Sequence, residues 1–331
     1  MSSGSTSRRF LDSLRSLGMT AIALAGCASP SPVPPVSPVQ PVWSYHPDAP
    51  RPYRLFLPAN VRPGAPLVVL LHGCTQDAAE FAAATRMNEY AAEAGAIVVY
   101  PEQPASANPQ KCWNWFLPAH QARGSGEPAI IAGIADSLAR AHRADPRRIY
   151  IGGLSAGAAM AVVTAVAYPD RFAAVASHSG IGWGVASDVA SALAAMRSGG
   201  ASSDSLVQGM RGAMGPHARP LPIFVVHGTA DAVVTPRASR VLLDQFAGLH
   251  RLLEPRADEL RGMSFEEAGG YRYERVTVNG TNNRLAIEAW FVDSLGHALS
   301  GGAPGARWTD SRGPNAAREM LRFFLEHPRA R

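Results

Sequence analysis

Charged residues are scarce in the 331-residue sequence, and no block of five or six like charges occurs. Asp, Glu, Lys and Arg make up 17% of the chain, against 47% for hydrophobic residues, and the formal net charge of +5 comes mostly from scattered arginines. Because nucleic acids and anionic membrane surfaces are recognised by clustered positive charge, neither is expected as a partner. The length and the hydrophobic fraction are typical of one large folded domain.

The N-terminal region lacks an apolar run long enough to span a bilayer as a stable helix. Its apolar stretch, residues 17–26, is short and follows a positively charged start that contains Arg8, Arg9 and Arg15. This arrangement is typical of a secretory signal peptide, and we predict one over residues 1–27.

The end of this stretch, Leu24-Ala25-Gly26-Cys27, resembles the bacterial lipobox, in which the peptide is cut before a cysteine that then carries lipid. The resemblance implies an exported protein that is anchored to a membrane of the cell envelope through Cys27. There are two alternatives: an ordinary signal peptide with an incidental cysteine, which would give a secreted protein, and a buried N-terminal helix.

Residues 28–52 are rich in proline, which disfavours helix and sheet. They are therefore predicted to form a spacer before a domain over residues 53–327.

Cysteine is also scarce, with three residues in the chain. If Cys27 carries lipid, Cys74 and Cys112 remain, and an even pair in an exported protein predicts a disulfide. Two free buried thiols are the alternative for a cytosolic enzyme.

No pair of histidines or carboxylates shows metal-ligand spacing, and there is no glycine-rich nucleotide fingerprint. We therefore expect neither a metal ion nor a cofactor.

From residue 53 onward, short apolar runs alternate with alanine-rich segments of helical spacing. Runs that are apolar on both faces are typical of strands in a covered, mostly parallel sheet, so the alternation predicts a doubly wound α/β fold. Residues 180–219 are expected to form a small cap-like insertion, and residues 271–292 a hairpin with Asn279-Gly280 in its turn. The expected strands are 67–71, 96–100, 148–151, 173–177, 222–226 and 286–292, and the expected helices are 79–94, 128–142, 156–167, 237–250 and 315–326.

The run Gly153-Leu154-Ser155-Ala156-Gly157 lies between an expected strand and an expected helix. A serine on such a tight turn presents its hydroxyl at the top of the sheet, and the flanking glycines avoid collisions with the adjacent strand and helix. The five-residue pattern alone could occur by chance, so its position carries the argument. Ser155 is therefore the predicted nucleophile, with a helix-capping serine as the alternative.

A serine nucleophile needs a base, and the base needs an acid that orients it. In the α/β-hydrolase fold the chain order is serine, acid, histidine. His297 lies in a glycine-flanked loop after the last expected strand and is the predicted base. Asp231 lies in the loop after residues 222–226 and is the predicted acid, with Asp293 as its rival.

The turn His72-Gly73-Cys74 resembles the oxyanion turn of this fold, which implies that the backbone amides of Cys74 and Ala156 form the oxyanion hole. The motifs described so far, together with Cys112-Trp113-Asn114-Trp115 and Gly301-Gly302, resemble the esterase/polyhydroxybutyrate depolymerase family of α/β-hydrolases. They are similar in particular to the type 1 catalytic domain of short-chain-length polyhydroxyalkanoate depolymerases, which is related to feruloyl and acetylxylan esterases. The resemblance covers residues 53–326.

The resemblance implies a serine esterase that hydrolyses 3-hydroxyalkanoate polymer or oligomer esters through an acyl-enzyme, without a cofactor. It makes Trp115, Trp113 and Trp183 candidates to line the acyl cleft, although they could be ordinary core or rim aromatics. Thr229 stands where many relatives have an aspartate. The chain ends shortly after the last expected helix without a polymer-binding domain, which favours oligomers, amorphous polymer or soluble esters. We expect a monomer whose partner is its ester substrate.

Two other functions stay open. The first is a carbohydrate-ester esterase that removes feruloyl or acetyl groups, because the loops that shape the pocket cannot be placed from the sequence. The second is a non-catalytic lipoprotein that binds ligands on an inherited hydrolase scaffold. The complete set of serine, acid, histidine and oxyanion donors argues against the second.

Overall fold

The computed structural model describes residues 40–330, apart from residues 202, 256–260 and 281–283. The chain divides into residues 1–38 and residues 39–331, and the description below concerns the second unit. The predicted signal peptide, the predicted lipid site Cys27 and the proline-rich part of the predicted spacer lie outside the described residues. Among the described residues, no helix is long and apolar enough to cross a membrane.

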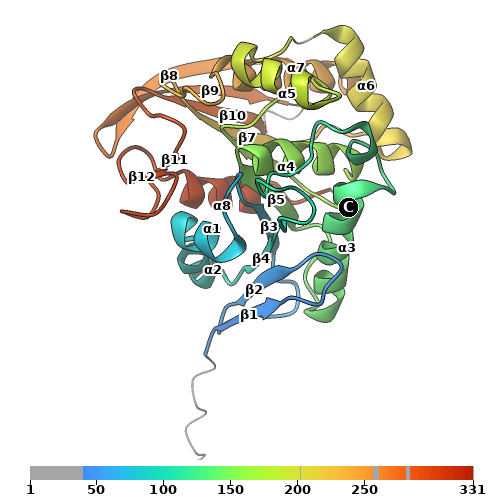
Figure 1. Cartoon of the computed structure of the whole chain (residues 1–331), viewed down its shortest axis with the longest axis vertical. Coiled ribbons are helices and arrows are strands. Elements are labelled where there is room, and N and C mark those ends of the chain that lie inside the picture. Colours follow the sequence, from blue (N-terminus) through green and yellow to red (C-terminus); the bar gives the residue numbers. More distant parts are fainter. Residues whose placement is uncertain (1–39, 202, 256–260, 281–283, 331) are drawn as a thin grey trace, which may run out of the picture. The chain divides into compact units, whose positions relative to one another are not determined.

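A ten-stranded sheet with the order β1-β2-β4-β3-β5-β6-β7-β10-β9-β8 forms the centre of this unit (Figure 1). The central strands from β4 to β10 in this order pair in parallel, whereas β1, β2, β9 and β8 join the two edges in antiparallel pairs. The six predicted strands are confirmed with small shifts at their ends. The strands are β1 (Val42–His46), β2 (Tyr53–Leu57), β3 (Leu67–Leu71), β4 (Ile97–Pro101), β5 (Ile149–Leu154), β6 (Val175–His178), β7 (Ile223–Gly228), β8 (Arg261–Ala268), β9 (Tyr271–Asn279) and β10 (Leu285–Val292).

Helices cover both faces of the sheet because successive side chains of a central strand point to opposite sides. In β3, Leu67, Val69 and Leu71 belong to the core beneath α3, α4, α6 and α7, whereas Val68 and Leu70 belong to the core beneath α1, α2 and α8. The predicted doubly wound arrangement is therefore confirmed. The helices are α1 (Ala78–Thr85), α2 (Met87–Ala94), α3 (Gly126–Ala141), α4 (Ala156–Ala167), α5 (Val189–Ser198), α6 (Asp204–Met214), α7 (Arg237–Leu253) and α8 (Ala316–Glu326), with short 3₁₀ turns at Pro118–His120 and Gly215–His217.

The folded unit begins earlier in the chain than predicted. Strand β1 lies inside the segment expected to be a spacer, where it pairs with β2 along its whole length. The ring of Trp43 packs edge-on against Tyr100 with 5.7 Å between ring centroids, so an aromatic contact fixes this edge strand. The structure therefore shortens the predicted spacer at its C-terminal end.

The helix predicted over residues 79–94 consists of two helices. Arg86 adopts a left-handed conformation with φ 54°, and α1 ends before it while α2 begins after it. The Thr85 hydroxyl donates to Ala82 O and accepts from the Met87 amide, which stabilises the break. A hydroxyl that bonds the local backbone in this way competes with the helical hydrogen bonds.

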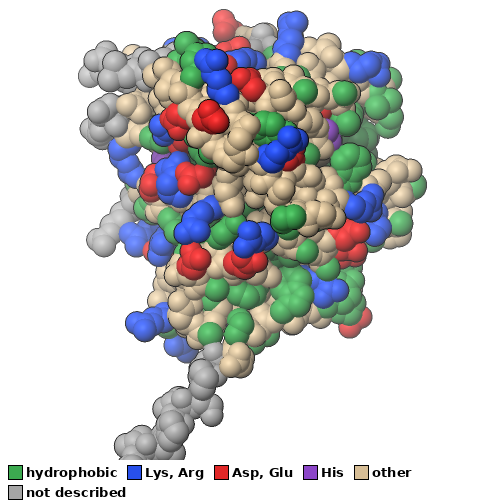
Figure 2. All heavy atoms as spheres, turned by 90° about the vertical axis from the view of Figure 1, so that its left-hand side faces the viewer, with side chains coloured by type: hydrophobic (Ala, Val, Ile, Leu, Met, Phe, Trp, Pro, Cys, Tyr) green, Lys and Arg blue, Asp and Glu red, His purple; other side chains and the backbone are tan. Residues whose placement is uncertain are grey.

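The two interruptions of the β-α alternation also differ in detail. The predicted hairpin is present as β9 and β10, but a further strand, β8, pairs with β9 at the edge of the sheet. Residues 180–219 contain α5 and α6, and the buried Val207, Met210 and Met214 of α6 join the core shared with α4 and α7. On the face in Figure 2, which carries β8, basic and acidic side chains are interspersed.

Candidate active site

Ser155 sits on a strained turn between β5 and α4. Its backbone has φ 57° and ψ −122°, a region that non-glycine residues seldom adopt. The Ser155 amide donates to His178 O at 2.9 Å, which holds the turn in place. A Cβ added to Gly157 would lie 2.2 Å from Leu71 O, and one added to Gly153 would lie 2.6 Å from the same atom. Only glycine allows this close approach of strand, turn and helix.

Two loops bring an imidazole and a carboxylate to the serine. His297 follows β10 and Asp231 follows β7, and these strands are parallel neighbours in the sheet. His297 Nε2 lies 3.0 Å from Ser155 Oγ, and His297 Nδ1 lies 2.7 Å from Asp231 Oδ2. The structure thus brings together the three residues predicted as nucleophile, base and acid.

Backbone and side-chain hydrogen bonds tie the two loops to each other. The Ala230 amide donates to Leu295 O at 3.0 Å, and the Ser294 amide donates to the Thr229 hydroxyl at 3.1 Å. A Cβ added to Gly228 would lie only 2.1 Å from Leu295 O. Thr229 therefore helps to hold the loop that carries His297.

The Asp231 carboxylate is held in its ionised form. Burial alone would raise its pKa, but hydrogen bonds with His227 and His297 keep the pKa well below the usual range of an aspartate. Oδ1 also accepts from the amides of Val233 and Val234, both at 2.9 Å. An ionised Asp231 fixes the proton of His297 on Nδ1 and leaves Nε2 free to accept the serine proton.

His227 is a buried partner of the acid that the sequence analysis did not identify. Its Nε2 lies 3.3 Å from Asp231 Oδ2 and 2.9 Å from Val234 O. Since both of these atoms are acceptors, Nε2 carries the proton, and Nδ1 accepts from the Ser239 hydroxyl at 2.6 Å. The spacing of His227 four residues before Asp231 was visible in the sequence, but nothing there indicated that the two side chains meet.

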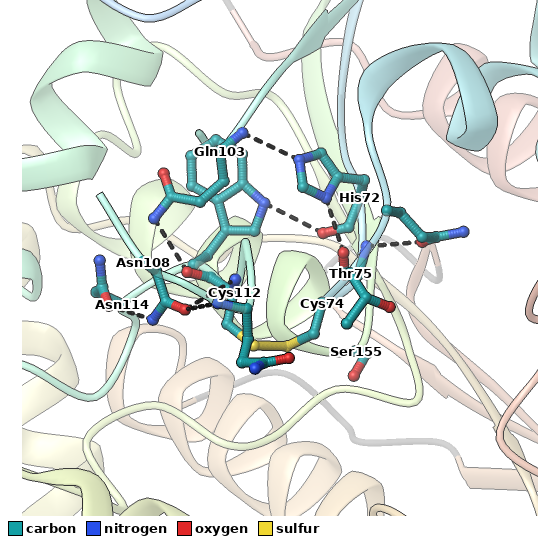
Figure 3. The surroundings of a disulfide bond; sticks show 12 residues. His72, Cys74, Thr75, Gln103, Asn108, Cys112, Asn114 and Ser155 are labelled. Carbon is teal, nitrogen blue, oxygen red and sulfur yellow. Dashed lines mark hydrogen bonds between the residues drawn. A yellow bond between two sulfur atoms is a disulfide. The ribbon is translucent and has the colours of Figure 1, made fainter. Parts of the chain in front are cut away.

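The turn after β3 leaves one backbone amide available near Ser155 (Figure 3). The Gly73 amide donates to Gln76 Oε1 at 2.9 Å, and the Thr75 amide donates to Gln110 O at 2.7 Å. Within the described part of the chain, the Cys74 amide has no hydrogen-bond partner. The amide of Ala156, at the first position of α4, has no intrahelical acceptor either. These two amides are the ones predicted as oxyanion donors.

His72 fixes the direction in which the Cys74 amide points. Its Nδ1 lies 2.7 Å from Gly73 O, the carbonyl of the Gly73–Cys74 peptide, and its Nε2 accepts from the Gln103 amide at 3.0 Å. Because a trans peptide is planar, the N–H of Cys74 points away from the carbonyl that His72 holds. Burial lowers the pKa of His72 to about 4, so the imidazole is neutral near pH 7 and donates from Nδ1.

A second segment, the loop from Gln103 to Trp115, is bonded to this turn and holds it in place. Trp113 Nε1 donates to His72 O at 3.1 Å, and a disulfide joins Cys112 to Cys74, as predicted (Figure 3). The buried Glu127 accepts from Gln103 Nε2 at 2.6 Å and from the Asn114 amide at 2.8 Å. Burial alone would raise the pKa of Glu127, but bonds from His120, Gln103 and Asn114 lower it, so the carboxylate is ionised and anchors the loop.

Two of the three tryptophans predicted to line the acyl cleft are buried, and the third is half-buried. Trp113 is 0% exposed and Trp115 is 5% exposed, because both rings pack into the hydrophobic core between the sheet and the helices α3, α4, α6 and α7. The half-buried Trp183 is bound through its backbone to Gln245. Trp308, which the sequence analysis did not single out, is 41% exposed, and its ring centroid lies 6.1 Å from that of His297.

The fold and the serine–histidine–aspartate geometry define the protein as an α/β-hydrolase. An acetyl xylan esterase from Aspergillus awamori has a similar structure, with a TM-score of 0.67 at 20% sequence identity, and the match covers 86% of this chain and 99% of that one. At this identity the likeness concerns the fold alone.

The chain belongs to the esterase PHB depolymerase family, whose model matches residues 52–268. It is 33% identical over 246 residues to poly(3-hydroxyalkanoate) depolymerase C of Paucimonas lemoignei, a match that covers 73% of this chain and 56% of that protein. Acetylxylan esterase A of Emericella nidulans is 32% identical, in a match that covers 39% of this chain and 42% of that protein. Feruloyl esterase B of Neurospora crassa is 33% identical, in a match that covers 42% of this chain and 47% of that protein. The chain thus spans about half the length of these relatives.

Proposed function

We propose that the protein is a serine esterase that hydrolyses carboxylic esters through an acyl-enzyme. One observation carries the proposal: His297 lies 3.0 Å from Ser155 Oγ on one side and 2.7 Å from Asp231 Oδ2 on the other. This arrangement has a base in reach of the nucleophile and an ionised acid in reach of the base. Membership of a family of esterases supports the same reaction.

In the proposed reaction, Ser155 Oγ bonds to the ester carbonyl carbon while its proton passes to His297 Nε2. The amides of Cys74 and Ala156 donate to the oxygen that becomes negative, at a helix N-terminus that also favours negative charge. The bond to the alcohol oxygen then breaks, and Nε2 returns the proton to that oxygen. A water molecule, activated by the same imidazole, releases the acid and restores Ser155.

For the substrate we propose 3-hydroxyalkanoate polymer or oligomer esters of the polyhydroxybutyrate type. The alignment with poly(3-hydroxyalkanoate) depolymerase C over 73% of the chain supports this choice. A carbohydrate ester is the second candidate, since acetylxylan esterase A and feruloyl esterase B align with shorter parts of the chain. Both candidates use the same bond-breaking chemistry and differ only in what surrounds the ester.

A hydrolysis panel separates the two substrates. We expect kcat/KM to be highest for hydroxybutyrate oligomers, lower for p-nitrophenyl butyrate and lowest for methyl ferulate and acetylated xylan. Turnover of the ferulate or acetylated xylan without turnover of the oligomers would replace the first substrate with the second. A Ser155→Ala variant measured in parallel ensures that the activity belongs to this site.

We also propose that the protein is exported and anchored to a membrane by a lipid on Cys27. The proline-rich spacer would separate the catalytic domain from that membrane, and the domain would be a monomer. The Cys74–Cys112 disulfide supports export, because disulfides persist in oxidising compartments. Metabolic labelling with a fatty acid tests the anchor. We expect label on the wild-type protein and none on Cys27→Ser, and equal labelling of the two would contradict the proposed anchor.

A further inference from the structure

Trp308 presents a large apolar ring beside the catalytic imidazole. It lies just before β12 (Thr309–Asp310), which pairs with β11 (Leu299–Ser300) in a short parallel ladder after His297. The ring meets the imidazole edge to face, with 6.1 Å between centroids and 77° between ring planes. With 41% of its surface exposed, the indole is open to a ligand that occupies the site.

The backbone of Trp308 is held in a conformation that does not suit it. Its φ of 58° lies in the left-handed region, which glycine and asparagine adopt readily and bulky side chains rarely do. Conformations of this kind persist only where surrounding contacts impose them, and they cluster at ligand sites. A glycine would satisfy the backbone here but would present no ring beside His297.

Hydrogen bonds on the two sides of Trp308 connect it to the loop of the base and to the oxyanion turn. The Leu299 amide donates to Trp308 O at 2.8 Å, which ties Trp308 to the loop that carries His297. On its other side, Arg307 donates to the Thr75 hydroxyl at 3.2 Å, and Thr75 directly follows the proposed oxyanion donor Cys74. The short segment that carries the indole is therefore bonded to both of the loops between which an ester carbonyl would lie.

The proposed reaction indicates which part of the ester would contact the Trp308 ring. During acylation, His297 Nε2 must give its proton to the departing alcohol oxygen, so the alcohol part lies against the imidazole. During deacylation, a water molecule takes that place. A ring that flanks His297 is thus in reach of the alcohol part only until the alcohol leaves.

We infer that Trp308 is a specificity-determining residue that binds the alcohol part of the ester during acylation. The inference rests on the proposed serine-esterase function. An indole favours an apolar or aromatic alcohol part over a small polar one. In an oligomer of 3-hydroxyalkanoates the alcohol part is the next hydroxyacyl unit, whose alkyl side group fits such a surface.

Two substrate series test the inference with Trp308→Gly and Trp308→Phe. In the first the acyl group stays butyrate and the alcohol is methanol or benzyl alcohol. In the second the alcohol stays p-nitrophenol and the acyl group is acetate or butyrate. Trp43→Phe on β1 is the matched control, since Trp43 is also 41% exposed and lies at the sheet edge.

We expect Trp308→Gly to lower kcat/KM for benzyl butyrate roughly tenfold more than for methyl butyrate, the scale of one lost aromatic contact. Trp308→Phe keeps part of the preference, and Trp43→Phe keeps all of it. The acetate-to-butyrate ratio stays as in the wild type. The deacylation rate constant, measured after the pre-steady-state burst with p-nitrophenyl butyrate, also stays unchanged.

Equal losses on both series, or a slower deacylation step, would show a structural role and overturn the inference. Unchanged kinetics in Trp308→Gly would overturn it as well. The proposed function fails in a different way, through a folded wild-type protein that shows neither a burst nor ester hydrolysis. The melting temperature of Trp308→Gly should stay within a few degrees of the wild type, since the left-handed backbone suits glycine.

Discussion

Replacing Trp113 with phenylalanine tests whether the supporting loop positions the oxyanion turn. The change removes the Nε1–H that donates to His72 O at 3.1 Å and keeps an aromatic ring in the core. His72 is completely buried, so its carbonyl would lose a partner that water cannot replace. An unsatisfied buried acceptor costs about 1–3 kcal/mol, which would appear in the free energy of unfolding.

The same change should also slow catalysis, because the supported turn contains the Gly73–Cys74 peptide whose N–H is the proposed oxyanion donor. Loss of one oxyanion donor lowers kcat by about 10²–10³-fold in serine hydrolases. The Cys74–Cys112 disulfide and the His72–Gly73 contact would remain in Trp113→Phe, so only part of this loss is expected. We expect kcat to fall about 10- to 100-fold, because the Cys74 amide aims less well at the oxyanion. The KM should change little, since the ground-state ester gains least from this donor.

Steady-state hydrolysis of p-nitrophenyl butyrate at a temperature where the variant is folded gives both constants. Trp290→Phe is the matched control, because Trp290 is also buried and its indole donates to Glu288 at 3.1 Å, in a core cluster that does not contain Trp113. It should lose stability without losing kcat. A Trp113→Phe protein with wild-type kcat, or a Trp290→Phe protein with an equal loss, would refute the reasoning.

Three further changes probe the acid, the disulfide and the buried carboxylate. Asp231→Asn should lower kcat about 10⁴-fold through loss of the correct histidine tautomer, with Asp293→Asn close to wild type in the same assay. A retained rate in Asp231→Asn would exclude it as the acid. The Cys74→Ser, Cys112→Ser double variant should lose about 3–4 kcal/mol in urea unfolding, given a sequence separation of 38, and a loss below about 1 kcal/mol would contradict this. Glu127→Gln should melt below the wild type near neutral pH. Because the pKa of Glu127 is lowered in the folded state, that difference should close as the pH falls below about 4, and a gap independent of pH would argue against an ionised Glu127.

The central strands and the tight turn around Ser155 could be predicted because their signals are local. Strand β3 is apolar at every position, and both of its faces are covered, so its pattern admits few other readings. The turn around Ser155 needs glycine at two positions for steric reasons, and the sequence shows both. Strands β1, β2 and β8 were missed. The edge strands β1 and β8 mix polar with apolar residues, which weakens any periodic signal, and β2, next to the edge, is only partly buried.

The surroundings of the site could not be predicted because they depend on contacts between distant segments. Nothing near Trp113 in the sequence indicates that its indole supports a turn 41 residues earlier, and the aromatic motif was therefore assigned to the cleft. Likewise, Trp308 lies in a glycine-rich loop whose course depends on β11, β12 and the contact with Thr75. The left-handed backbone at Trp308 has no signature in its residue type.

Labelling with a fluorophosphonate probe, followed by mass spectrometry of the peptides, tests most directly whether Ser155 is an activated nucleophile. We expect the probe on the peptide that contains Ser155, no label on a folded Ser155→Ala protein, and loss of p-nitrophenyl butyrate hydrolysis in parallel. A folded wild-type protein that stays unlabelled at Ser155, or a Ser155→Ala protein that keeps full activity, would contradict the proposed mechanism.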